Sequence, residues 1–158
     1  MNAAREAWFE GQLELDPTRI VFIDETAANT KMARLYARAP RGERCRAPVP
    51  HGHWKTTTFT AGLRHDGIAA PMVLDGPMNG EAFLAYGEQA RVPELRPGDI
   101  VIMDNLPAEM AFAKLKALLR AAAARTIPDL WQAIADALRR FTAQECANYL
   151  AAAGYHAT

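Results

Sequence analysis

Two short stretches of the chain are continuously apolar and end at an aspartate. Residues 19–24 read RIVFID, and residues 99–104 read DIVIMD. An uninterrupted apolar run of this length is typical of a strand that is buried on both faces of a sheet. We therefore predict two buried strands, each with an acid, Asp24 or Asp104, at its carboxyl end.

The middle of the chain follows a different pattern. Residues 54–64 alternate with period two, and Asp66 and Gly67 separate them from a second β-type run, 68–74. An Asp-Gly pair between two such runs predicts a hairpin. Asn79 is a suitable N-cap for a helix that reaches about residue 91.

The last third of the chain has helical periodicity. Pro107 suits the first turn of a helix, and large apolar residues then recur at intervals of three and four. Thr126 with Asp129, and Thr142 with Glu145, resemble capping boxes at the starts of two further helices. Strands followed by helices predict an α/β or α+β fold with one main sheet.

Length and composition place these elements in one domain. The 158 residues are half apolar, which is enough for a single core spanning residues 1–158, with C-terminal helices in 107–154. No apolar run approaches the roughly 20 residues that cross a bilayer, so we expect a cytoplasmic protein without a membrane partner. Cys45 and Cys146 form no paired motif, and we predict neither a disulfide nor a zinc site.

The charge is balanced overall but unevenly distributed. Residues 31–64 hold eight basic side chains and one acidic side chain, and residues 111–125 hold four basic ones and no acid. Basic segments of this density favour a polyanionic partner, since each neutralised phosphate releases counterions. A solvated basic loop explains the same charges equally well.

The two aspartates at the predicted strand ends are the first candidates for chemistry. If the strands are parallel neighbours, Asp24 and Asp104 lie side by side at the sheet edge where ligands bind in α/β folds. Two adjacent carboxylates repel unless a proton or a cation lies between them, and hard oxygen ligands favour Mg²⁺ or Mn²⁺. The alternative is that each acid only caps the turn that follows it.

Several short motifs, in order along the chain, resemble one family. The motifs are Phe22–Thr26 (FIDET), Ala39–Gly42 (APRG), His51–Thr56 (HGHWKT), Gly62–Arg64 (GLR), Ile100–Asn105 (IVIMDN) and Phe141–Tyr149 (FTAQECANY). Together they resemble bacterial insertion-sequence transposases of the DDE superfamily, in the group related to mariner.

The resemblance implies a ribonuclease-H-like mixed sheet and a triad of metal ligands formed by Asp24, Asp104 and Glu109. Such a site would hold two Mg²⁺ or Mn²⁺ ions and cut and transfer DNA strands by in-line displacement at phosphorus. Residues 31–50 correspond to a clamp-like insertion that holds DNA or a partner subunit. The implied partners are transposon-end and target DNA, at the bacterial nucleoid, and a second transposase subunit, including a homodimer. The implied DNA-binding residues are Arg38, Arg41, Arg44, Arg46, Lys55, Lys114 and Lys116.

The sequence departs from the family pattern after the second acid. Glu109, with Pro107 before it, matches the third acid motif but stands only five positions after Asp104. The helix and strand that the family has between these acids are missing, and so is its N-terminal helix-turn-helix. We therefore expect a shortened domain with impaired cleavage. The alternatives are a non-catalytic remnant that binds DNA or a transposase subunit, and a small metal-dependent phosphohydrolase.

Overall fold

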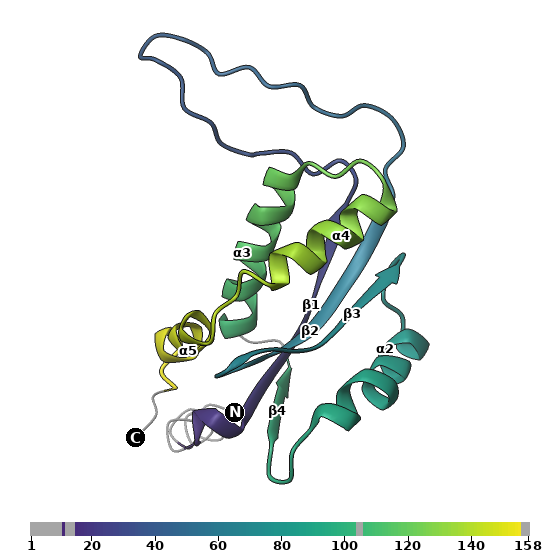
Figure 1. The fold of residues 1–158 in the computed structure, drawn as a ribbon, viewed down its shortest axis with the longest axis vertical. Helices are drawn as coiled ribbons and strands as arrows, with labels where there is room; N and C mark the ends of the chain where they lie inside the picture. Colours follow the sequence, from purple (N-terminus) through teal and green to yellow (C-terminus); the bar gives the residue numbers. More distant parts are fainter. Residues whose placement is uncertain (1–10, 12–14, 104–105, 156–158) are drawn as a thin grey trace, which may run out of the picture.

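The predicted strands assemble into one mixed sheet in the order β3-β2-β1-β4 (Figure 1). The structure is a computed structural model that describes residues 11, 15–103 and 106–155. β1 is antiparallel to β2 and parallel to β4, and β2 is antiparallel to β3. The strands are β1 (Ile20–Asn29), β2 (Thr56–Arg64), β3 (Gly67–Asp75) and β4 (Ile100–Met103).

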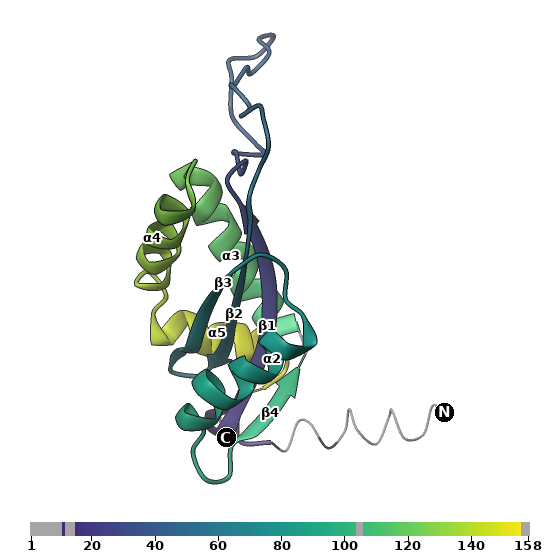
Figure 2. The same ribbon diagram turned by 90° about the vertical axis from the view of Figure 1, so that its right-hand side faces the viewer.

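Helices cover both faces of this sheet, which confirms the α/β prediction. In Figure 2, α3 and α4 lie on one side of the sheet and α2 lies on the other. The helices are α2 (Gly80–Tyr86), α3 (Leu106–Ala122), α4 (Ile127–Leu138) and α5 (Ala143–Ala152). α2 runs on into a π-helical turn, η2 (Gly87–Arg91), and short 3-10 turns form η1 (Pro17–Arg19) and η3 (Val92–Glu94). None of the helices in the described part of the chain combines the length and apolar character of a bilayer-crossing segment.

β1 is buried on both faces because its alternate residues enter two different cores. Ile20 and Phe22 pack with side chains of α3, α4 and α5, and the ring of Phe22 lies 5.2 Å from that of Tyr155. Ile23 faces the other way and packs with Tyr86 at the end of α2. The continuous apolar run is therefore buried on both faces of the sheet, as predicted.

The end of β1 was predicted wrongly. The strand does not stop at Asp24 but continues to Asn29, paired with β2 down to the register Asn29–Thr56. The extension is stable because Thr26 and Ala28 are buried beneath the α3 side of the sheet. Asp24 therefore lies in the middle of a strand. The sequence of residues 3–12 predicts a short helix ending near Gly11, and this segment falls almost wholly outside the described residues.

The β2–β3 hairpin forms with its turn one residue earlier than predicted, at His65 and Asp66. β3 then carries a bulge, where Ala70 takes a positive φ of 47°. The Glu94 carboxylate accepts a hydrogen bond of 2.7 Å from the Ala70 N–H. A side chain from a distant turn thus satisfies the backbone group that the bulge removes from the ladder.

Helix starts follow the predicted caps. Asn79 caps α2, and Thr126 and Thr142 cap α4 and α5 through their side-chain oxygens. Thr142 and Glu145 form a complete capping box. At α4 the Asp129 side chain accepts a hydrogen bond from the Thr126 hydroxyl. The known preference for Asn and Thr at helix N-caps was therefore sufficient to predict the start of all three helices.

The two cysteines differ sharply in accessibility. Cys45 is exposed, whereas Cys146 is fully buried and burial raises the pKa of its thiol to about 11. We expect a thiol-specific reagent at neutral pH to modify one cysteine in the native protein and both after denaturation, because the thiolate is the reactive form. A Cys45→Ser variant identifies the reactive thiol. Rapid labelling of that variant under native conditions would show that α5 is not packed as described.

Candidate functional site

Asp24 lies where β1 extends beyond its parallel neighbour. Within the described residues the β1–β4 register ends at the pair Ile23–Met103, one residue before Asp24. The two strands are therefore parallel neighbours, which is the condition under which Asp24 and Asp104 were expected to lie side by side. Asp24 is half-buried, and its Oδ1 accepts a hydrogen bond of 2.7 Å from the Glu25 N–H. Asp104 follows Met103 and lies outside the described residues, so its predicted role stays a prediction.

Glu109 approaches the same region from a helix. It occupies the first turn of α3 and is exposed, and α3 is fixed on the sheet by buried residues such as Ala108 and Phe112. The Phe112 ring meets that of Phe59 on β2 edge-on, with 5.5 Å between centroids. Asp24 and Glu109 consequently line one cavity of about 460 Å³ between β1 and α3. Its lining residues are Asp24, Glu25, Thr26, Glu109, Phe112, Ala113, Lys116 and Arg120.

Helical geometry explains which basic residues of α3 reach this cavity. Each residue turns an α-helix by about 100°, so Lys116 and Arg120 point within roughly 20° of the direction of Glu109. Lys116 was predicted to bind DNA, but Arg120 was not. The spacing of seven and eleven residues from Glu109 would have identified both.

Lys114 points elsewhere, about 140° around the helix from Glu109. Its Nζ donates hydrogen bonds to the Glu145 carboxylate at 2.6 and 2.8 Å and to the Arg140 carbonyl at 2.9 Å. The Lys114 ammonium also lies 4.5 Å from the centroid of the Phe141 ring. Hydrogen bonding from Lys114 lowers the pKa of the Glu145 carboxyl. These contacts tie α3 to α5, whereas the DNA-binding role predicted for Lys114 has no support in this geometry.

A second cavity lies on the other face of the sheet. It has a volume of about 290 Å³ and is lined by Ile23, Asp24, Glu25, Thr60, Phe83 and Met103. Glu25 pairs with Thr60 across the β1–β2 ladder, so the two side chains share a face. Since successive residues of a strand point to opposite faces of the sheet, the Glu25 side chain points away from that of its neighbour Asp24.

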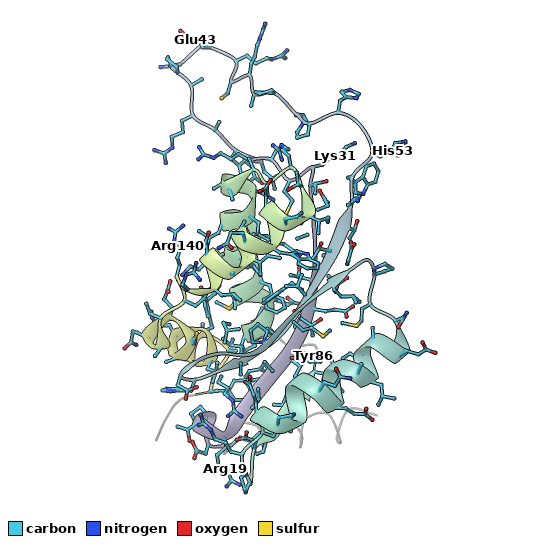
Figure 3. The ribbon with its side chains drawn as sticks, turned by 45° about the vertical axis from the view of Figure 1, so that its right-hand side comes forward. Arg19, Lys31, Glu43, His53, Tyr86 and Arg140 are labelled. Atoms are coloured by element: carbon cyan, nitrogen blue, oxygen red, sulfur yellow. The ribbon has the colours of Figure 1, made fainter. Side chains whose placement is uncertain are left out.

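The predicted basic insertion is an extended loop that leaves the sheet after Asn29 and returns before Thr56. In Figure 3 its labelled residue Glu43 lies far from the sheet, while Lys31 and His53 lie near its base. All five of its arginines are exposed, as is Lys55 at the base; the arginines are Arg34 and the four predicted to bind DNA, Arg38, Arg41, Arg44 and Arg46.

Specific contacts hold the base of this loop. The Thr30 N–H donates to the Lys55 carbonyl at 3.2 Å, and the Lys31 ammonium lies 4.4 Å from the centroid of the Trp54 ring. The Arg125 guanidinium, which follows α3, donates to the Thr30 and Met32 carbonyls at 3.2 and 2.9 Å. The loop is therefore anchored to the sheet and to the α3–α4 connection.

The cavity beside α3 offers ligands of one chemical kind for a metal. Asp24, Glu25 and Glu109 supply carboxylate oxygens, and the described lining includes no cysteine or histidine. This donor set fits a hard divalent cation such as Mg²⁺ or Mn²⁺. Among the residues that the structure describes, no three acidic, histidine or cysteine side chains gather as a complete metal site. The described acids of this cavity are thus by themselves an incomplete ligand set.

Comparison with solved structures supports the predicted fold. A pre-cleavage Mos1 transpososome matches with a TM-score of 0.63 and 13% sequence identity, over 95% of this chain and 57% of that chain. A Mos1 strand transfer complex matches with a TM-score of 0.61 and 14% identity, over 95% of this chain and 56% of that chain. The chain thus has the ribonuclease-H-like fold of these proteins and spans little more than half their length.

Comparison of sequences identifies the family. No curated protein sequence matches the chain. The family model described as "DDE superfamily endonuclease" matches residues 19–138, which include β1, the basic loop and α3. This match covers well over half of the chain, so the chain belongs to the family of DDE superfamily endonucleases.

Proposed function

We propose that the chain is the catalytic domain of a DNA transposase, which cuts a DNA strand and transfers the cut end to new DNA. The observation that carries the proposal is the cavity shared by Asp24 and Glu109. Two carboxylates that are 85 positions apart in the sequence converge there from β1 and α3. The family match and the likeness to Mos1 assemblies support the same activity.

The proposed ligands of the metal are Asp24, Asp104 and Glu109. Enzymes of this superfamily use divalent metal ions, generally Mg²⁺ or Mn²⁺. Two such ions would lower the pKa of an attacking water and stabilise the leaving oxygen at phosphorus. The contribution of the chain is to hold Asp24 on a strand and Glu109 on a packed helix, so that both residues line one cavity.

The basic loop is the proposed contact with DNA and with a second subunit. Its five exposed arginines and Lys55 would neutralise phosphates without reading the base sequence. The loop also exposes large apolar side chains, with Tyr36 90% and Val49 71% accessible. A homodimer partner or another transposase subunit would cover them, at the nucleoid of a bacterial cell.

A nicking assay tests the proposed activity. We expect the purified chain to convert supercoiled plasmid to open circles in Mg²⁺ or Mn²⁺ and to leave it intact in EDTA. Because the carboxylates need a cation to approach a phosphate, the activity depends on the metal. A mock purification from cells without the chain controls for contaminating nucleases. Nicking that persists in EDTA would contradict the proposal.

One observation favours a second function, DNA binding without cleavage. Only residues 104–105 separate β4 from α3, so no further strand lies beyond β4 in this part of the chain. β4 is therefore the edge strand of the sheet, and its residues Val101 and Met103 are 40% and 61% exposed. DNA binding that is unaccompanied by nicking in either metal would support this second function.

A further inference from the structure

The buried threonines in the described part of the chain fall into two groups. Three of them use their hydroxyl groups in hydrogen bonds; these are Thr30, Thr57 and Thr58. The hydroxyls of Thr26 and Thr60 have no hydrogen-bond partner among the described residues, although Thr26 is only 5% exposed and Thr60 is fully buried. A buried hydroxyl without a partner destabilises a fold, so its presence calls for a functional or ligand-dependent explanation.

Both unpaired hydroxyls belong to residues that line a cavity next to Asp24. Thr26 lines the cavity beside α3, and Thr60 lines the cavity on the other face of the sheet. None of the three hydrogen-bonded threonines is among the described residues that line either cavity. The hydroxyls without a partner therefore lie where a bound group can supply one.

Thr26 faces the same side of the sheet as Asp24. Alternate residues of a strand share a face, and the register partner of Thr26 is Phe59, which belongs to the core beneath α3. Thr60 is instead paired with Glu25 and faces the opposite side. Of the two unpaired hydroxyls, that of Thr26 is therefore the one on the side of Asp24 and α3.

The spacing along β1 suits a bridge of one water between the two side chains. Residues two apart on a strand lie about 6.7 Å from each other, and the Thr26 hydroxyl makes no direct hydrogen bond to the Asp24 carboxylate. Two successive hydrogen bonds of about 2.8 Å span roughly 5.6 Å. A single water can consequently accept from the Thr26 hydroxyl and donate to the Asp24 carboxylate.

We propose that Thr26 is a positioning residue of the cation site: when a divalent cation binds, the Thr26 hydroxyl donates to a water that the Asp24 carboxylate also holds. The inference rests on the proposed function, because it takes Asp24 as a metal ligand. The bridge fixes the orientation in which the carboxylate meets the cation, and supporting contacts of this kind contribute roughly 10- to 100-fold to metal affinity. The hydroxyl thus serves cation binding, whereas an apolar group of the same shape serves the fold of the metal-free chain equally well.

Two substitutions of Thr26 separate cation binding from stability. Thr26→Val keeps the shape of the side chain and removes the hydroxyl. Its affinity for Mn²⁺, measured by calorimetry without DNA, is expected to fall about 10- to 100-fold. Its urea denaturation midpoint in EDTA is expected to equal or exceed that of the wild type. Thr26→Ser keeps the hydroxyl and removes a buried methyl group, so it is expected to retain the wild-type Mn²⁺ affinity and to denature at lower urea.

The matched control is Thr60→Val, which removes the other unpaired hydroxyl on the opposite face and is expected to leave Mn²⁺ affinity unchanged. Equal Mn²⁺ affinities of the wild type and Thr26→Val would overturn the inference. An equal loss of affinity in Thr26→Ser or in Thr60→Val would also overturn it, since the loss would then not depend on the Thr26 hydroxyl. A midpoint of Thr26→Val below that of the wild type would show that the hydroxyl is already paired in the metal-free chain, which contradicts the inference.

The nicking assay separates this inference from the proposed function. A chain that binds Mn²⁺ through a site sensitive to Thr26→Val, but never nicks DNA, would support the inference and refute cleavage. A chain that nicks DNA, and whose Mn²⁺ affinity does not respond to Thr26→Val, would support cleavage and refute the inference. Absence of Mn²⁺ binding by the wild type would refute the inference whatever the result of the nicking assay.

Discussion

Replacing Asp24 by asparagine is expected to reduce metal-dependent nicking by more than about 100-fold. Even groups that only orient a metal ligand contribute roughly 10- to 100-fold to metal affinity or activity, so loss of a ligand has at least that effect. The fold is expected to survive, because an asparagine oxygen can still accept the hydrogen bond from the Glu25 N–H. The measurement is the nicking rate in Mg²⁺ and Mn²⁺, with Mn²⁺ binding followed separately by calorimetry.

The matched control for this variant is Asp75→Asn, which removes the same charge at the exposed end of β3. Its nicking rate is expected to equal that of the wild type. The Glu109→Gln variant tests whether Glu109 is a third metal ligand. A loss of nicking as large as that of Asp24→Asn supports Glu109 as a ligand. Unaltered nicking and unaltered Mn²⁺ binding in both variants would refute a metal site in this cavity.

Asp99→Ala is expected to lower the free energy of unfolding by about 3–5 kcal/mol, because it leaves a buried charge without its partner. The carboxylate of Asp99 and the guanidinium of Arg64 form an ion pair whose side chains are each only 5% exposed. Arg64 also donates to the Glu94 carbonyl at 3.1 Å, and Asp99 accepts from the Arg96 N–H at 2.8 Å. The pair therefore fastens the end of β2 to the turn that begins β4. Urea denaturation at neutral pH measures the loss.

A nearby exposed ion pair supplies the control. Asp66 and Arg96 lie 3.5 Å apart with side chains 58% and 65% exposed, and Asp66→Ala is expected to cost less than about 1 kcal/mol. If Asp99→Ala cost no more than this, the Arg64 guanidinium would have to be hydrated in the native state, which contradicts its burial.

The ion pair between Arg64 and Asp99 is expected to lose its stabilising effect at low pH. Hydrogen bonding from Arg64 holds the pKa of Asp99 below its ordinary value of 3.8. A carboxyl group whose pKa is lower in the folded state than in the unfolded state stabilises the fold when it is ionised. This stabilisation is complete above the pKa of the unfolded state and is lost as the pH falls through the pKa of the folded state. The difference in stability between the wild type and Asp99→Asn is therefore expected to narrow below pH 3.8.

The sequence by itself determined the local elements and the family. The two apolar runs became β1 and β4, and the threonines and the asparagine expected as caps begin their helices, because these features depend on neighbours within a few residues. The motifs around Asp24 were sufficient to indicate the family that the sequence comparison then identified. The sequence left open whether β1 and β4 are neighbours, and the structure shows that they pair in parallel.

Only the tertiary structure decided how far β1 extends and which basic residues of α3 line the cavity. Asp24 resembled a strand end, but pairing with β2 and burial under α3 carry the strand to Asn29. Lys114 and Lys116 are indistinguishable by composition, yet one is paired with Glu145 on α5 and the other lines the cavity. Likewise nothing local predicts that Arg64 meets Asp99. Each of these outcomes depends on packing between segments that are far apart in the chain, where the direction of a side chain and the identity of its neighbours are set by the assembled sheet and helices.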